Sequence, residues 1–164
     1  INVYNTFGDI MRIVIQRVSE ASVSVGGELI SKIEKGMMIL LGIEDADTEE
    51  DVDWLCNKLT KLRIFSDEND AMNLDINQVE GSFLVVSQFT LYADCRKGNR
   101  PSFVKAGAPD EANRLYEYFM ERCKTHVAKV EHGIFGADMK VESVNDGPVT
   151  LILDTDQLMT EPRR

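Results

Sequence analysis

The chain has 164 residues, the size of one compact domain with its own core, and its 43% hydrophobic and 28% charged residues are ordinary for a globular protein. The formal net charge of −10 argues against nucleic-acid binding through a wholly basic face. No apolar run is long enough to cross a bilayer, so we expect no membrane contact.

The first ten residues, INVYNTFGDI, lack the basic start and the continuous apolar centre of a signal peptide. A strand pattern opens at Met11, so we interpret residues 1–10 as an extension or a cloning remnant. Residues 11–156 are expected to form the functional domain, and residues 157–164 a flexible tail.

Strand patterns dominate the start of this domain. β-branched residues predict strands at 12–18 and 21–25, and Gly26-Gly27 predicts a hairpin turn into a strand at 28–33. The almost entirely apolar segment 37–43 is typical of a central strand that is covered on both faces.

Two helices are predicted, each with apolar residues at helical spacing. The first starts after Asp47 or Thr48 and has the stripe Val52, Leu55, Cys56, Leu59 and Leu62. The second starts around Pro109-Asp110 and has the stripe Ala112, Leu115, Tyr116, Phe119 and Cys123. Between them we predict a loop at 66–75 and a central strand at 83–87, and after them closing strands at 127–131, 139–144 and 149–154. The expected fold is a single mixed α/β domain with strand-rich sheet layers and two principal helices.

The three cysteines favour a reducing, cytoplasmic location, because they are scattered along the chain and cannot all pair. Cys56 and Cys123 fall on the apolar helix faces, where a small buried side chain is expected. There are only two histidines and no cysteine pair at metal-ligand spacing, so we predict neither a metal nor a cofactor. No phosphate-binding glycine motif and no GxSxG motif is present.

Two polar segments stand next to apolar strand patterns. SQFTLYAD, residues 87–94, follows an apolar run and could project side chains and backbone N–H groups into a cleft. A strand that simply crosses from core to surface explains it equally well. NDGPVT, residues 145–150, has the composition of an ordinary turn before a strand, with a trans proline favoured on local grounds.

A basic segment, RKGNRPSFVK, carries four of the 18 basic residues and none of the 28 acidic residues. Its cations are Arg96, Lys97, Arg100 and Lys105. A local basic loop on an acidic body suits a focused anionic ligand, although a merely solvated loop is the more common outcome.

Several of these motifs, in this order, resemble those of the D-aminoacyl-tRNA deacylases. They are IQRV with ASVSV, RIFSD with MNLD, SQFTLYAD, GNRPSF, FGADM and NDGPVT, and they extend from about Met11 to Asp154. The resemblance implies hydrolysis of the ester that joins a D-amino acid to the 3′ end of tRNA. It also implies a homodimer with active sites at the subunit interface.

The same resemblance assigns roles to residues of the two polar segments. Ser87, Gln88, Phe89 and Thr90 would line the pocket. Gly147 and Pro148 would be joined by a cis peptide bond and would reach into the partner's pocket, where rigid backbone rejects L-aminoacyl groups. Such a filter does not by itself exclude glycine, so mischarged glycyl-tRNA stays a possible substrate.

The resemblance implies roles for three further groups of residues. Arg17 would hold the Gly–Pro segment through a charge-assisted hydrogen bond, although on a strand it could also simply pair with an acid. The basic loop would contact acceptor-stem phosphates. Phe135 and Met139 would pack on the terminal adenine or, equally, in the core.

Two mechanisms and one rival function stay open. Thr90 could be the nucleophile, but the motifs supply no base, which favours hydrolysis assisted by the ribose 2′-OH with backbone N–H groups near Phe89 and Thr90 holding the oxyanion. The rival function is a non-catalytic RNA- or protein-binding module on the same scaffold.

Overall fold

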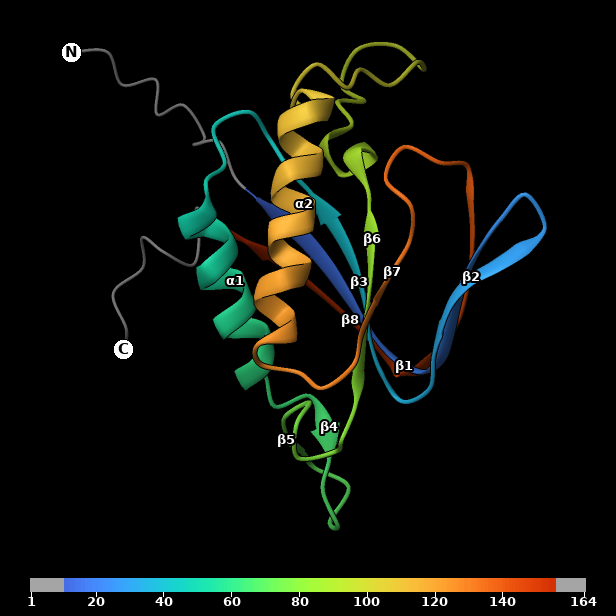
Figure 1. The fold of residues 1–164 in the computed structure, drawn as a ribbon, viewed down its shortest axis with the longest axis vertical. Helices are drawn as coiled ribbons and strands as arrows, with labels where there is room; N and C mark the ends of the chain where they lie inside the picture. Colours follow the sequence, from blue (N-terminus) through green and yellow to red (C-terminus); the bar gives the residue numbers. More distant parts are fainter. Residues whose placement is uncertain (1–10, 156–164) are drawn as a thin grey trace.

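The computed structural model describes residues 11–155, and within this range two helices cover one face of a six-stranded mixed sheet (Figure 1). The expectations for residues 1–10 and 157–164 lie outside the described residues. The elements are β1 (Arg12–Val25), β2 (Glu28–Ile33), β3 (Gly36–Gly42), α1 (Glu49–Lys61), β4 (Phe65–Ser66), β5 (Met72–Leu74), β6 (Ser82–Ser87), the 3₁₀ turn η1 (Phe89–Tyr92), α2 (Pro109–Lys124), β7 (Val130–His132) and β8 (Met139–Asp154). The predicted mixed α/β class with two principal helices is confirmed.

The long strand β1 organises the sheet, whose order is β2-β1-β3-β6-β7 with β8 also paired to β1. The first half of β1 pairs with β3 and its second half with β2, and β8 runs antiparallel along both halves. The pairs β3–β6 and β6–β7 are parallel. The carboxyl ends of β3 and β6 therefore meet at the same edge, where the SQFT segment begins.

Successive side chains of the central strands point to opposite faces of the sheet, so their apolar residues supply two cores, one on each face. Met37, Ile39 and Leu41 of β3 belong to the large core under α1 and α2. Met38 of the same strand belongs to a smaller core with Val18, Val23, Ile33, Leu84 and Val86. Both faces of β3 are thus covered, as its continuous apolar run predicted.

The helices begin close to the predicted residues. The backbone N–H of Thr48 donates to the Asp51 carboxylate at 2.9 Å, which caps the first turn of α1. Pro109 stands in the first turn of α2, where its missing N–H costs nothing. Cys56 and Cys123 face each other between the two helices, with their sulfur atoms 3.0 Å apart and buried. Neither helix is long and apolar enough to cross a membrane.

Three predictions of secondary structure are wrong in detail. The expected strands at 12–18 and 21–25 are one strand, β1, because β8 pairs with both parts of it, although the register shifts between Gln16 and Val18 and between Val18 and Glu20. The expected loop at 66–75 contains β5, which pairs with β4 to form a short projecting ladder. The strand expected at 127–131 is β7, which begins three residues later at Val130.

The NDGPVT segment is not a turn between two strands, which is a further correction. Residues 139–144 and 149–154 belong to one strand, β8, which continues through this segment. Gln16 pairs with Thr150 and Val18 with Asn145, so Arg17 alone lies opposite the four residues 146–149. The segment is therefore a bulge of several residues in an antiparallel ladder. The composition of NDGPVT predicts a turn that reverses the chain. Instead, the residues on both sides of the bulge pair with β1, so the chain keeps the same direction through it.

Candidate active site

A cavity of about 420 Å³ opens where the carboxyl ends of β3 and β6 meet the start of α2. Its lining is mostly apolar, with polar groups confined to the end of β6 and the turn that follows it. The lining residues are Leu41, Ile43, Ser87, Gln88, Phe89, Phe103, Ala106, Gly107, Pro109, Ala112, Phe135 and Gly136. Such a pocket suits a flat or apolar group that is oriented by a few polar atoms.

The SQFT segment forms the polar border of this cavity. The Gln88 N–H donates to the Leu41 carbonyl of β3 at 2.8 Å. This bond fixes the residue that connects β6 to η1. The Gln88 side-chain amide donates to the Thr90 hydroxyl. Within residues 11–155, no acceptor is hydrogen-bonded to the backbone N–H groups of Phe89 and Thr90. Hydrogen bonds within this range therefore leave both donors unused.

Aromatic side chains border the cavity from three segments of the chain. Phe89 and Phe103 meet edge to face, with ring centroids 5.2 Å apart, and Phe89 is 59% exposed. Phe135 packs against Tyr116, whose hydroxyl donates to the Val85 carbonyl at 3.0 Å. Burial raises the pKa of Tyr116, so this hydroxyl remains a donor at neutral pH. The rings of Phe89 and Phe103 provide an aromatic surface next to the SQFT segment.

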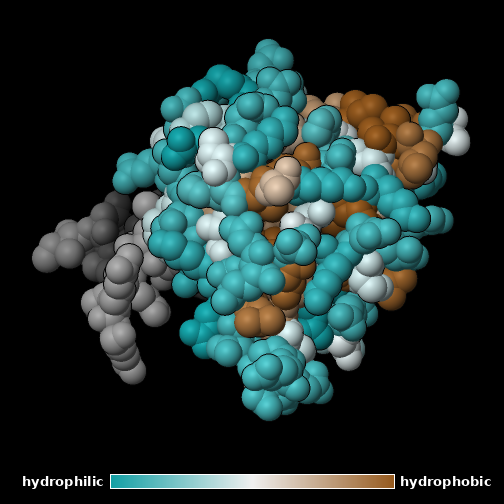
Figure 2. Space-filling model, turned by 60° about the horizontal axis from the view of Figure 1, so that its bottom comes forward, coloured by the Kyte–Doolittle hydropathy of each residue, from teal (hydrophilic) through white to brown (hydrophobic). Residues whose placement is uncertain are grey.

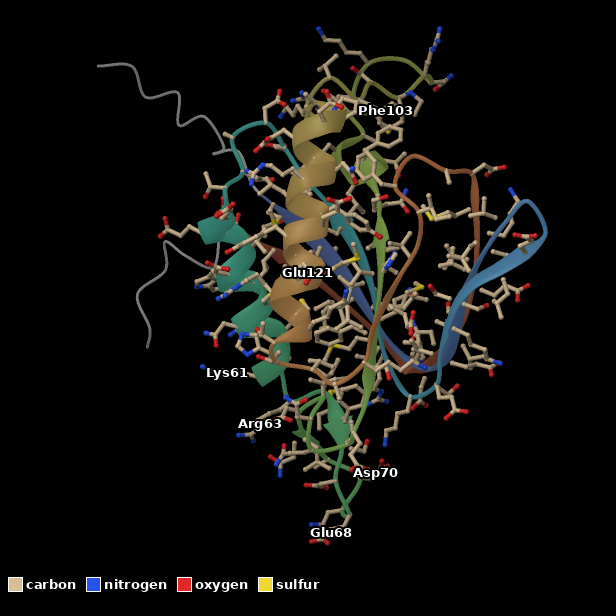
Figure 3. All side chains as sticks on the ribbon, in the orientation of Figure 1. Lys61, Arg63, Glu68, Asp70, Phe103 and Glu121 are labelled. Atoms are coloured by element: carbon tan, nitrogen blue, oxygen red, sulfur yellow. The ribbon has the colours of Figure 1, made fainter. Side chains whose placement is uncertain are left out.

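The basic loop lies beside the same end of the sheet. Figure 3 shows Phe103 of this loop at the far end of the molecule from Glu68 and Asp70, which lie in the turn between β4 and β5. Asp94 and Ser102 exchange two backbone hydrogen bonds that close the base of the loop. The guanidinium of Arg96 binds the Asp94 carboxylate at 2.6 Å and holds the pKa of that carboxyl well below its usual range. Lys97, Arg100 and Lys105 are exposed.

The Gly–Pro bulge is held by Arg17 and by its own polar residues. Arg17 Nε donates to the Asp146 carbonyl at 2.9 Å, and Nη1 donates to the Ile64 carbonyl at 2.7 Å. The Asn145 side chain accepts from the Val149 N–H at 2.8 Å. The peptide bond between Gly147 and Pro148 is cis, and both residues are exposed.

Gly147 also has a steric reason to be glycine. Its φ of +135° disfavours any side chain, and a Cβ there would lie 2.8 Å from Val149 Cγ2 and 3.1 Å from an Arg17 nitrogen.

The structure gathers only part of the predicted site. Ser87, Gln88, Phe89 and Phe135 line the cavity, and Thr90 lies directly behind Gln88. Gly147, Pro148 and Arg17 are not among its lining residues in this chain. Met139 is not either, because it packs with the smaller core next to Gly133.

Sequence reasoning missed several lining residues, above all Phe103. This residue stands in the GNRPSF motif but was grouped with the basic loop. No group of three or more potential metal ligands is present among the described residues.

Known proteins match this chain over most of its length. A family model described as D-Tyr-tRNA(Tyr) deacylase matches residues 14–154. A D-aminoacyl-tRNA deacylase of Flavobacterium johnsoniae is 55% identical over 146 residues, 88% of this chain and 97% of the relative. One from Bacteroides fragilis is 57% identical over the same length and coverage.

Among solved structures, one described as a c-Myc DNA unwinding element binding protein is 41% identical with a TM-score of 0.81, over 87% of this chain and 97% of that one. The fold and the matches together define a hydrolase of the aminoacyl-tRNA deacylase class. Within that class, the chain belongs to the D-Tyr-tRNA(Tyr) deacylase family.

Proposed function

We propose that the protein hydrolyses the ester bond of D-aminoacyl-tRNA in the cytoplasm and releases the free amino acid and tRNA. The observation that carries this proposal is the cavity itself, whose polar lining comes from Ser87 and Gln88. Next to it in the chain are the backbone N–H groups of Phe89 and Thr90, which donate to no acceptor among residues 11–155. In this proposal, the carbonyl oxygen that gains negative charge during hydrolysis accepts hydrogen bonds from both donors. Family membership supplies the chemical class of the substrate.

In this mechanism, water attacks the ester carbonyl carbon and the bond to the ribose 3′ oxygen breaks, with a proton passing to that oxygen. The N–H groups of Phe89 and Thr90 stabilise the intermediate oxyanion, and one such donor typically contributes about 10²–10³ in rate. The Thr90 hydroxyl is contacted by the Gln88 amide, which cannot act as a base. Neither His126 nor His132 lines the cavity. This favours assistance by the ribose 2′-OH over a threonine nucleophile.

Selection against L-aminoacyl groups is assigned in this proposal to Gly147 and Pro148 of a second copy of the chain. These residues are exposed and do not line the cavity of their own subunit, which is what a trans-acting probe requires. The homodimer is supported by exposed apolar residues on β8, with Val144 50% and Ile152 66% exposed. Apolar patches interrupt the mostly hydrophilic surface in Figure 2. A backbone wall of this kind admits hydrogen, so glycyl-tRNA is a possible further substrate.

The tRNA end is bound in this proposal by the cavity and by the basic loop. Phe135 offers its ring to the terminal adenine, while Met139 acts through the core that supports Gly133. Arg96, Lys97, Arg100 and Lys105 contact phosphates without reading bases. The loop is short, which suits an acceptor end better than a long duplex.

A non-catalytic nucleic-acid- or protein-binding module is the alternative, and the description of the solved relative as a DNA unwinding element binding protein raises it. The deciding experiment compares deacylation of D- and L-tyrosyl-tRNA by the purified protein. We expect rapid hydrolysis of the D-ester and little of the L-ester. Binding of tRNA without hydrolysis of the D-ester, by a folded protein, would establish the alternative instead.

A further inference from the structure

The backbone N–H groups of Phe89 and Thr90 belong to the short turn η1, whose position depends on contacts with the rest of the chain. The turn η1 spans only four residues, Phe89–Tyr92, and so closes a single 3₁₀ turn. A single turn fixes many dihedral angles for very few hydrogen bonds and is unstable alone. Thr90 is exposed, and Phe89 packs edge to face on Phe103, a residue of the basic loop that is itself exposed. The position of their N–H groups must therefore be set by contacts elsewhere in η1.

Tyr92 supplies the first of these contacts. Its side chain is only 5% exposed, and its hydroxyl donates to the Gly42 carbonyl at 2.8 Å while accepting from the Arg12 N–H at 3.1 Å. Burial raises the pKa of Tyr92, so the hydroxyl keeps the proton that it donates. Gly42 lets the ring approach closely, because a Cβ there would lie 2.9 Å from a ring carbon.

Arg12 supplies the second contact, from the first residue of β1. Its Nη1 donates to the Leu91 carbonyl at 3.1 Å, and its Nε binds the Asp154 carboxylate at 2.8 Å at the end of β8. The guanidinium also lies 5.8 Å from the centre of the Tyr92 ring. Asp154 is buried and Arg12 is part-buried, so this ion pair is shielded from the solvent that weakens exposed pairs.

We propose that Tyr92 and Arg12 are positioning residues, which fix η1 against the ends of β1, β3 and β8 so that the Phe89 and Thr90 N–H groups point at the reacting carbonyl. Neither residue lines the cavity, so both act through η1. This inference rests on the proposed function. A displacement of reacting groups by about 1 Å can cost up to about 10² in rate. Loss of either anchor therefore lowers the rate of the chemical step more than it weakens binding.

The test is Tyr92→Phe, which removes the two hydrogen bonds of the hydroxyl and keeps the ring. Tyr118→Phe is the matched control, because its hydroxyl donates to Asp53 at 2.9 Å between α1 and α2, outside the cavity lining. With D-tyrosyl-tRNA, Tyr92→Phe is expected to lower kcat about tenfold and to change KM less than about twofold. Tyr118→Phe is expected to leave both parameters near the wild-type values.

Arg12→Lys is the second variant, and it decides the matter if Tyr92→Phe does not fold. A lysine keeps the positive charge opposite Asp154. It lacks the planar guanidinium, whose separate nitrogen atoms bind the Asp154 carboxylate and the Leu91 carbonyl at the same time. It is expected to lower kcat by about threefold to tenfold with KM nearly unchanged. Folded variants that keep wild-type kcat, or that lose activity only through KM, would overturn the positioning role. An inactive wild-type protein would instead overturn the proposed function, so the two failures are distinguishable.

Discussion

Arg17 joins the Gly–Pro bulge to the segment just before β4, because its Nε donates to the Asp146 carbonyl at 2.9 Å and its Nη1 to the Ile64 carbonyl at 2.7 Å. Its side chain is 11% exposed, whereas that of Asp146 is 60% exposed. The bulge is thus held mainly through its backbone. A main-chain anchor of this kind constrains the carbonyl directions of the residues that follow.

Replacing Arg17 by alanine is therefore expected to relax chiral selection before it abolishes hydrolysis. Hydrogen bonds from a charged group are worth about 1.5–3 kcal/mol each, so we expect the ratio of D- to L-tyrosyl-tRNA deacylation rates to fall at least about tenfold. The matched control is Arg114→Ala, which removes exposed pairs with Glu49 and Glu111 on the helices. An unchanged ratio in folded Arg17→Ala would contradict the assignment.

Thr90→Ala separates the two mechanisms. If the ribose 2′-OH assists hydrolysis, the variant keeps the backbone N–H and loses only a hydroxyl, so we expect a partial loss of about tenfold in kcat. The measurement is single-turnover hydrolysis of D-tyrosyl-tRNA. Complete loss, together with an acyl-threonine trapped in the wild-type protein, would establish Thr90 as the nucleophile.

The cysteines give a prediction that does not depend on the activity. Cys56 and Cys123 are buried, and the hydrogen bond to Cys56 together with burial raises the pKa of Cys123, which keeps it as an unreactive thiol. Cys95 is exposed. A thiol reagent at neutral pH should label one cysteine per native chain and three after denaturation, and Cys95→Ser should abolish the native labelling. Labelling of Cys123 in the native protein would contradict the packing of α1 on α2.

Periodicity in the sequence was sufficient to predict the elements whose packing is uniform along their length. The continuous apolar run at 37–43 predicts one strand, and the helical stripe from Val52 to Leu59 predicts one helix. The structure contains both, as β3 and α1. The strands β1 and β8 were each divided in two, because polar residues interrupt their patterns. Their continuity depends on pairing with each other across more than 100 residues of chain, which no local pattern contains.

Residues of the candidate site can be predicted together from the sequence only where they are consecutive in one motif. Ser87 to Thr90 are consecutive, so their common location follows from the strand end. Phe103 joins them through a tertiary contact with Phe89, and its neighbours in sequence are mostly polar or basic, which concealed it. Tyr92 and Arg12 were missed for the same reason, because their hydrogen bonds join segments 80 residues apart.

Phe103→Ala tests whether the edge-to-face pair with Phe89 forms part of the binding surface. Stacking of a base on an aromatic ring is worth about 1–3 kcal/mol, so we expect KM for D-tyrosyl-tRNA to rise about tenfold with a smaller change in kcat. Phe103→Tyr keeps the ring and is expected to restore KM. If alanine and tyrosine variants behave alike, the ring contributes nothing to substrate binding.

The basic loop is tested by the salt dependence of tRNA binding. Each phosphate contact contributes roughly 0.7–0.9 to the slope of log K against log salt, so Lys97→Ala and Arg100→Ala should each reduce the slope by about that amount. Arg96→Ala should reduce it less, because Asp94 already binds this guanidinium at 2.6 Å and competes with phosphate. Lys58→Ala on α1 is the control, since it removes an equal charge from an exposed residue outside the cavity lining. Equal slopes for the wild-type protein and the Lys97 and Arg100 variants would show that the loop does not contact tRNA phosphates. A large decrease in slope that is confined to the Arg96 variant would show that the ion pair with Asp94 breaks when tRNA binds.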